Sequence, residues 1–439
     1  MLSFKSRGGK WRERNTGRRG MSRTDTVPTP APPLGDILAA IQHNDLEEAK
    51  DEKDSAAQIT GSQYLTSYNW LDKSSHQIIV PGEDSREPPA WTPLLRPTKL
   101  REDSGQYYRD LNAARYPTYP LEPMIRAILT DKPDFSLANL DIVGCGSTMG
   151  NLLRFARGQN QPFRIIVELV GQTVFLIRRE NSPTERIPDV RGYGHTFPEA
   201  YTTWNARVKG SESHQRLINY DFAGLNCLVR FEADGYLPQL VPGLKTMQNH
   251  DPETEKEQEE GLLASLEGTV IVSCHPVDVA DMSNELEITK GGQHIPQSAV
   301  FDLKTRSIKR MDVDTLGDEL ARLWIGQIPN FVLAYHKSGT FEDIRVQDVR
   351  EKIKHWESSH QVELVKFANL LHMIISFVRS TESGKIEIEH EEGVQTLNLR
   401  AQGGGVNNVL PVTVRDKWDH ESDLDESPTP AAVLSDSCL

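Results

Sequence analysis

The chain has 439 residues, of which 37% are hydrophobic and 26% charged, and its formal net charge is −14. This composition is typical of a water-soluble protein with enough apolar material for a sizeable core. The longest apolar stretch, LLHMIISFV at 370–378, is too short to span a bilayer, so we expect no membrane partner. The negative charge argues against a general grip on nucleic acid, although it leaves room for a small basic pocket.

The start of the chain differs from the rest. The stretch MLSFKSRGGKWRERNTGRRGMSR (1–23) is rich in Arg and Lys, and it lacks the apolar region of a secretory signal. We expect residues 1–62 to form a disordered basic and Pro-rich tail, with one short helix in LGDILAAIQ (34–42). An Arg-rich start is also typical of a mitochondrial presequence or a nuclear signal, and Met21 is an alternative first residue.

The middle of the chain carries alternating strand and helix patterns, which predict one domain over 63–403. EPMIRAIL (122–129) predicts a helix with a proline in its first turn. RIIVELVGQTVFLIRRE (164–180) and RLINYDFAGLNCLVRFEADGY (216–236) each predict an antiparallel hairpin around a glycine turn. An acidic, polar insertion is expected at about 240–295, where QNHDPETEKEQEEG begins at position 248.

The second half continues in the same manner. AVFDLKTRSI (299–308) predicts a strand, DTLGDELARLWIGQ (314–327) an amphipathic helix, and PNFVLAYHKSGTFEDIRV (329–346) a hairpin. One or two long helices follow at 349–380, then two strands at 384–401, and an acidic tail at 404–439. The predicted fold class is therefore α+β, with a central mixed, antiparallel-rich sheet flanked by helices.

A glycine-rich segment, ANLDIVGCGSTMGNLLRFARG (138–158), has two readings. A strand, a loop with Gly144, Gly146 and Gly150, and a helix resemble a nucleotide cradle. Such a cradle continues into a second parallel strand, whereas the next segment here reads as an antiparallel hairpin. We therefore favour an ordinary helix start.

The four cysteines lie far apart, without a CxxC pair. This spacing predicts neither a disulfide framework nor a zinc site. It suits a reducing, intracellular compartment, nuclear or cytoplasmic.

Two predicted strands carry charges where apolar residues are expected. Glu232 and Asp234 are two positions apart in the first, and Asp302 and Lys304 in the second. Because a strand has a period of two, each pair points to one face, and neighbouring strands would bring all four together. Converging carboxylates require a cation, and oxygen ligands favour Mg²⁺ or Mn²⁺. A lysine beside such an ion orients water for phosphodiester hydrolysis. The alternative is a solvated sheet face that needs no function.

The segment 191–399 resembles the DXO-type decapping exoribonucleases of the PD-(D/E)XK nuclease superfamily. The successive motifs of that family correspond here to GYGHTFPEAY, RFEADGY, FDLKTR and RLWIGQIPNFVLAYH. The resemblance implies metal ligands at Asp234 and Asp302 and a water-assisting lysine at Lys304. It also matches Glu232 to the family's Glu-x-Asp and Gln327 to its glutamine.

This chain departs from the family pattern at one expected ligand. Pro198 stands directly after the phenylalanine of the first motif, and Glu199 follows one position late. The predicted site comprises catalytic, metal-binding and phosphate-binding groups. They are Lys304, Glu232 and Gln327 as catalytic residues, Asp234, Asp302 and Glu199 as metal ligands, and Arg230 and Arg306 as phosphate-binding residues.

A second resemblance, over about 64–401, is to fungal proteins labelled geranylgeranyl pyrophosphate synthetase. It is carried by SYNWLDKSSHQIIVPG, DSGQYYRDLNAARYPTYPLEP and GYGHTFPEAYTTW. Prenyl synthases hold diphosphate through magnesium bound by DDxxD motifs on helices, and this chain contains no Asp-Asp dipeptide.

Three functions are thus considered. The first is a metal-dependent nuclease or RNA 5′-end hydrolase, with RNA or another nucleic acid bound in a local pocket. The second is a nuclease-like scaffold that has lost turnover and binds a partner of unknown identity. The third, a prenyl synthase, has only the family label behind it.

Overall fold

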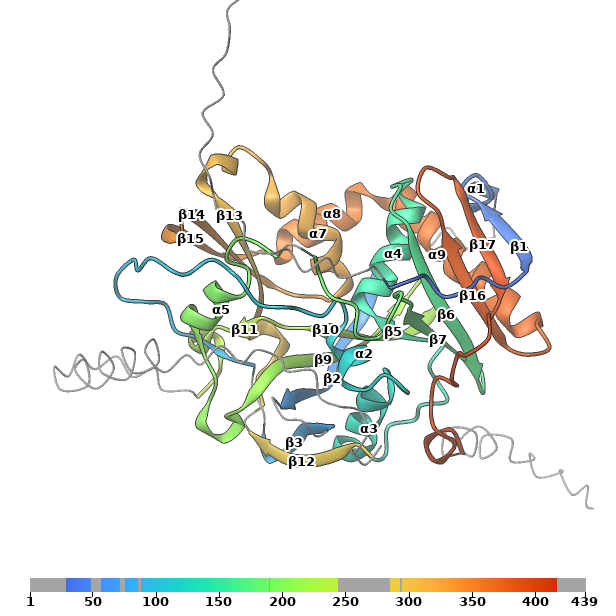
Figure 1. The fold of residues 1–439 in the computed structure, drawn as a ribbon, viewed down its shortest axis with the longest axis horizontal. Helices are drawn as coiled ribbons and strands as arrows, with labels where there is room; N and C mark the ends of the chain where they lie inside the picture. Colours follow the sequence, from blue (N-terminus) through green and yellow to red (C-terminus); the bar gives the residue numbers. More distant parts are fainter. Residues whose placement is uncertain are drawn as a thin grey trace, which may run out of the picture.

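The computed structural model describes residues 29–48, 57–71, 76–85, 88–188, 190–243, 285–292 and 294–416. Within these residues the chain forms two sheets with helices packed around them (Figure 1). The α+β fold class predicted from the sequence is confirmed.

The larger sheet has eleven strands in the order β1-β17-β16-β6-β7-β5-β10-β9-β2-β3-β12. Its strands are β1 (Ile37–Gln42), β2 (Ile59–Leu71), β3 (Gln77–Ser85), β5 (Ile142–Cys145), β6 (Phe163–Val170), β7 (Thr173–Arg178), β9 (Ser211–Phe222), β10 (Leu225–Glu232), β12 (Glu287–Gly292), β16 (Lys385–His390) and β17 (Thr396–Ala401). The sheet is mixed, because β5 runs parallel to both β7 and β10, and β12 runs parallel to β3.

The smaller sheet has six strands in the order β15-β14-β13-β11-β4-β8. Its strands are β4 (Ala90–Trp91), β8 (Thr202–Thr203), β11 (Gly235–Tyr236), β13 (Val300–Ser307), β14 (Asn330–Lys337) and β15 (Thr340–Asp348). β13 is parallel to β14 and antiparallel to β11, so the segment predicted at 299–308 lies in the middle of this sheet.

Helices pack on both faces of the larger sheet, and one short helix, α5 (Thr196–Tyr201), packs on the smaller sheet (Figure 1). The other helices are α1 (Asp45–Glu48), α2 (Leu111–Arg115), α3 (Glu122–Asp131), α4 (Gly146–Ala156), α7 (Thr315–Ile325), α8 (Arg350–Ser359) and α9 (Gln361–Ser380). Because side chains alternate along β10, Cys227 and Val229 pack in the core with α4, α7 and α9, whereas Leu228 packs in the core with α3.

Helix α9 has the length and composition of a membrane span, with a mean hydropathy of 1.3. Its apolar residues Leu364, Phe367, Leu371 and Ile374 are nevertheless buried in the main core of the protein. Core helices of water-soluble proteins pass the same test of length and composition, so α9 is explained by its packing.

Most of the predicted elements are confirmed. The hairpins β6–β7, β9–β10 and β14–β15 and the strand pair β16–β17 are antiparallel, as the turn signals indicate. The predicted helices at 122–129, 314–327 and 349–380 correspond to α3, α7, and α8 with α9. Helix α4 begins at Gly146 directly after β5, and the antiparallel hairpin β6–β7 follows it in the chain.

The prediction for the N-terminal segment is wrong. Residues 37–42 form strand β1 instead of a helix, and β1 pairs with β17 at the edge of the larger sheet. The folded unit therefore starts before residue 63. It also extends past residue 403, since Val409, Leu410 and Val414 are buried. Most of the predicted acidic insertion lies outside the described residues, but β12 falls within it.

Both cysteines in the described part of the chain, Cys145 and Cys227, are free and buried. The other two cysteines, Cys274 and Cys438, lie outside the described residues.

Candidate functional site

The predicted acid cluster forms where the chain crosses from one sheet to the other. β10 of the larger sheet ends at Glu232, and β11 of the smaller sheet begins at Gly235. Gly235 pairs with Phe301 in an antiparallel ladder, so the residue before it, Asp234, lies opposite Asp302. The Leu303 backbone N–H donates a hydrogen bond to Asp234 Oδ2 at 2.6 Å, which fixes this arrangement.

This geometry corrects one part of the prediction. Glu232 and Asp234 do not share a face of one strand, because β10 ends at Glu232 and Asp234 lies in the link to β11. Likewise, Glu232 and Asp302 belong to different sheets. The structure does bring Asp234 next to Asp302, and the charge of Asp302 raises the pKa of Asp234, as the charge of Asp234 raises that of Glu232.

Two of these acids have strongly raised pKa values. Burial and then the charge of Asp302 raise the pKa of Asp234 to about 7, although nearby cations and the Leu303 N–H oppose the shift. Burial and then the charges of Asp234 and Glu212 raise the pKa of Glu232 to about 7. Glu232 is the exposed last residue of β10, so its carboxylate is crowded by neighbouring groups while it stays in contact with solvent.

Arg322, on α7, binds the most deeply buried acid of the cluster. Asp302 is only 1% exposed, and both of its oxygens accept hydrogen bonds from Arg322. The bond from Arg322 Nη2 to Asp302 Oδ1 is 2.6 Å long, and Arg322 Nε also donates to Glu319 Oε2 at 2.8 Å. A planar guanidinium matches a carboxylate in this bidentate manner, which strengthens the pair.

Glu319 also forms ion pairs with the two other cationic side chains on this face, Lys304 and Arg306. Its Oε1 atom lies 3.9 Å from Lys304 Nζ and 3.8 Å from Arg306 Nη2. Lys304 and Arg306 are both 33% exposed, so these are loose, partly solvated ion pairs. Lys304 therefore stands beside the acid cluster with part of its side chain accessible, as its predicted role requires.

The donor chemistry at this site fits a hard divalent cation. Asp234 and Asp302 offer carboxylate oxygens, and the raised pKa of Asp234 marks a place where a cation is favourable. In the arrangement seen, however, Arg322 holds both oxygens of Asp302. Accordingly, no group of three or more His, Cys, Asp or Glu side chains in the described part of the chain is arranged to hold a metal ion.

Glu199, the third predicted ligand, is placed elsewhere. It lies on α5, whose Phe197 packs with Phe301 and Leu303 of β13. Because side chains alternate along a strand, Phe301 and Leu303 point away from the face that carries Asp302. α5 therefore covers the opposite face of the smaller sheet, and the prediction that Glu199 joins Asp302 around one ion is not supported by this geometry.

The surroundings of Glu199 agree with this placement. Burial raises the pKa of Glu199, the charge of Asp103 raises it further, and that of Arg101 lowers it. Asp103 also accepts hydrogen bonds from the backbone N–H groups of His195 and Thr196 at the start of α5. These contacts belong to the packing of α5.

The two predicted phosphate-binding arginines differ in their exposure to solvent. Arg230 is 3% exposed and donates to the Pro120 carbonyl at 3.0 Å, so it lies inside the protein and not at an open surface. The prediction for Arg230 therefore needs correction, because β10 directs its side chain into the interior, where it also lies 3.5 Å from the Tyr68 hydroxyl. Arg306 is partly exposed on the face that carries Lys304, where an anion can reach it.

Gln327 lies just beyond the end of α7 in a left-handed conformation, with φ of 46°. Its side-chain amide donates to the Trp324 carbonyl at 2.6 Å, and its own carbonyl accepts from Gln297 at 3.0 Å. A non-glycine residue in this conformation needs support from its surroundings, and these two bonds supply it. In this arrangement the side chain of Gln327 closes the helix end.

Sequence reasoning missed Arg322 and Glu319. The available signal was their spacing of three on a predicted amphipathic helix, which places both on one face. That spacing is ordinary for a solvated helix face. Only the packing of α7 against β13 shows that this face meets the acid of the acid-x-Lys motif.

Comparison with known proteins identifies the family. Residues 36–416 match a family model described as Domain of unknown function (DUF8563). The chain belongs to this family. No curated protein matches the sequence.

Solved structures share the fold of this DUF8563 chain. Rai1 of Scheffersomyces stipitis, in complex with (3′-NADP)+ and calcium ion, matches with a TM-score of 0.54 and 11% identity, covering 88% of this chain and 99% of that chain. Rai1 of Candida albicans, in complex with pU5-Mn2+, matches with a TM-score of 0.51 and 10% identity, covering 84% and 96%. Rai1 of S. pombe, in complex with 3′-FADP, matches with a TM-score of 0.50 and 10% identity, covering 83% and 100%.

These likenesses confirm the predicted decapping-nuclease type of fold. The label of geranylgeranyl pyrophosphate synthetase finds no support, because the described chain is built on two sheets and not on a helical cavity. At 10–11% identity the likeness concerns the fold, and the activity has to be argued from the residues.

Proposed function

We propose that this protein is a divalent-metal-dependent phosphodiester hydrolase that acts on RNA ends. The observation that carries the proposal is the register of β11 against β13, which sets Asp234 opposite Asp302 with Lys304 two residues further along. Proteins with the same fold bind pU5-Mn2+ or 3′-FADP, which supports a nucleotide-containing substrate and a divalent ion.

The roles follow from the chemistry of each side chain. Asp234 and Asp302 would hold the ion, Mg²⁺ or Mn²⁺, and the bound ion would stabilise negative charge at the phosphoryl oxygens. Lys304 orients the attacking water, and Arg306 attracts the phosphate from the same face. Glu232, with a pKa raised to about 7, is suited to accept a proton from that water near neutral pH.

The test combines binding with turnover, using the full chain. Calorimetry with Mg²⁺ or Mn²⁺ should show binding by the parent and none by an Asp234→Ala/Asp302→Ala variant. A screen of 5′-phosphorylated and capped RNAs at millimolar Mn²⁺ should show hydrolysis by the parent only. The control is Asp343→Ala/Asp348→Ala, which removes two acids of β15 that pair with exposed arginines. Hydrolysis that persists in the first variant, or a parent that cleaves none of these RNAs, would contradict the proposal.

A second function is favoured by the contact between Arg322 and Asp302. In that case the acid cluster is a permanent internal ion pair, and the fold binds RNA or another partner without cleaving it. RNA binding that needs no divalent ion, measured by filter retention and combined with an absence of products, distinguishes this function from the first.

A further inference from the structure

We propose that Arg322 is an internal cation that competes with the divalent ion for Asp302, so that the structure shows the closed state of the site. This inference rests on the proposed metal-binding role of the acid cluster and concerns its control. In the closed state Arg322 bonds both oxygens of Asp302, a side chain that is 1% exposed. A metal ion bonded to the same carboxylate would lie next to the guanidinium, and the two positive charges repel each other.

Arg322 is the cation that fits this role among its neighbours. Lys304 and Arg306 reach Glu319 only at 3.9 and 3.8 Å, whereas Arg322 has direct hydrogen bonds to Asp302. The guanidinium thus compensates the negative charge of Asp302, as a bound metal ion would.

The Arg322 side chain can leave without disturbing α7. It is 42% exposed, whereas the next residues, Leu323 and Trp324, are 0% and 1% exposed and anchor the helix in the core. Its Nε atom already bonds Glu319, one turn earlier on the same helix. Glu319 therefore offers a second partner that holds the guanidinium at the surface once Asp302 is released.

Competition of this kind has a measurable consequence. The apparent affinity of a ligand is proportional to the fraction of the protein that is in the binding-competent state. A protein that is mostly in the closed state therefore binds the ion more weakly. Removal of the guanidinium should therefore raise the affinity for the ion. It should also lower the stability of the metal-free protein, because a buried Asp302 loses its partner.

The experiment compares the full-length parent with Arg322→Gln, Arg322→Lys and a control, Arg345→Gln. Arg345 has the same type of contact, with Asp343, but on the exposed strand β15. Mn²⁺ affinity is measured by calorimetry, and thermal midpoints are recorded with and without millimolar Mn²⁺. We expect Arg322→Gln to bind Mn²⁺ at least tenfold more tightly than the parent. Its midpoint should be lower without metal and should rise more with metal, and Arg345→Gln should match the parent.

Arg322→Lys keeps the charge but loses the bidentate contact. We expect it to fold and to bind Mn²⁺ more tightly than the parent, though less tightly than Arg322→Gln. It therefore decides the question if Arg322→Gln does not fold.

The outcomes separate this inference from the proposed function. If the parent binds Mn²⁺ through Asp234 and Asp302, and neither Arg322 variant binds it more tightly, the competition is overturned and the metal site stands. If no binding is seen in the parent or in a folded Arg322 variant, both the competition and the metal site are overturned.

Discussion

At the scale of single residues, Asp234 shows how the fold can favour the protonated form of a carboxyl group. Its carboxylate is held by the Leu303 N–H and stands opposite Asp302. Burial and the charge of Asp302 together raise its pKa to about 7, from an ordinary value near 4. The folded protein therefore binds a proton at Asp234 that the unfolded chain releases between about pH 4 and pH 7.

This pKa shift predicts a pH dependence of stability. The contribution of Asp234 is fully present below about pH 4 and is lost as the pH rises towards about 7, because the folded state then has to hold the ionised form. Asp234→Asn cannot ionise and keeps the acceptor for Leu303. Its free energy of unfolding should therefore gain on that of the parent across this range and level off above it. Urea unfolding at several pH values measures this, with Asp343→Asn as control, and parallel curves for parent and Asp234→Asn would refute it.

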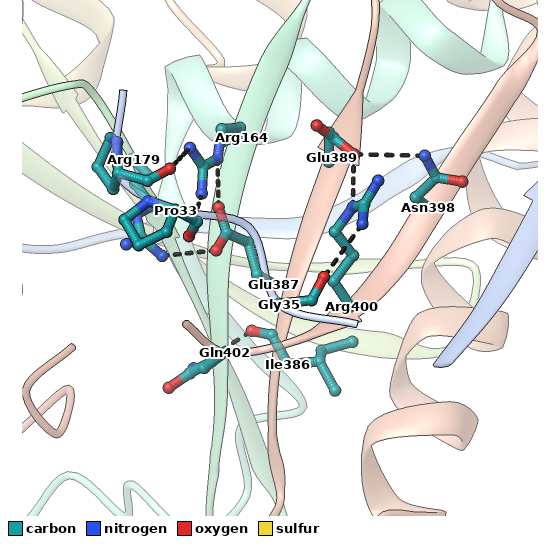
Figure 2. Close-up of polar contacts among 11 residues, drawn as sticks. Pro33, Gly35, Arg164, Arg179, Ile386, Glu387, Glu389, Asn398, Arg400 and Gln402 are labelled. Carbon is teal, nitrogen blue, oxygen red and sulfur yellow. Dashed lines mark hydrogen bonds and ion pairs between the residues drawn. The ribbon is translucent and has the colours of Figure 1, made fainter. Parts of the chain in front are cut away.

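At the scale of elements, β16 is a strand whose observed burial differs from the burial that its local sequence pattern predicts. Its sequence KIEIEH alternates, and alternation alone would direct Glu387 and Glu389 to solvent. Both are buried, and Figure 2 shows why: Glu387 meets Arg164 and Arg179, and Glu389 meets Arg400. The charged face of β16 is thus a covered layer of ion pairs.

Removal of one charge from this layer should be costly. Glu387 is fully buried and pairs with two arginines that are 16% and 11% exposed. Glu387→Gln keeps the shape but leaves both guanidinium groups without their carboxylate, so we expect a loss of about 3–5 kcal/mol in the free energy of unfolding. The matched control is Glu351→Gln, where the pair with Lys354 is exposed and a change of about 0.5 kcal/mol or less is expected. Similar losses in urea unfolding for both variants would contradict this account.

Local pattern predicted many of these elements, but not the one at 37–42. The segment ILAAIQ combines helix-forming alanines with isoleucines, so its local preference is ambiguous. In the fold it pairs with β17, and Ile41 is buried at 3% exposure. A ladder to a partner about 350 positions away decides the conformation, and no local window of sequence contains it.

At the scale of the whole molecule, the N-terminal segment packs against the layer of ion pairs on β16. Arg164 donates to the Pro32 carbonyl at 2.6 Å. Arg400 donates to the Gly35 carbonyl at 3.0 Å (Figure 2). β1 then continues the larger sheet beyond β17. A segment that the sequence assigns to a disordered tail is therefore part of the folded unit.

Two deletions test this role. Removal of residues 1–28 leaves β1 and its contacts in place and should not change the thermal midpoint. Removal of residues 1–43 exposes the edge of β17 and removes Ile41 from the core, so we expect the midpoint to fall by about 3 °C or more. Equal midpoints in calorimetric scans of the two proteins would show that β1 is not needed.

The sequence by itself determined the fold class, most of the helices and hairpins, and the four charged residues around which the candidate site is built. Those features depend on periodicity, turn residues and spacing within short windows, which one stretch of chain contains. Tertiary structure alone decided that the chain changes sheets between Glu232 and Gly235, that α5 covers the far face of β13, and that Arg322 meets Asp302. Each of these depends on the register or packing of segments distant in sequence, and long-range register has no local signature.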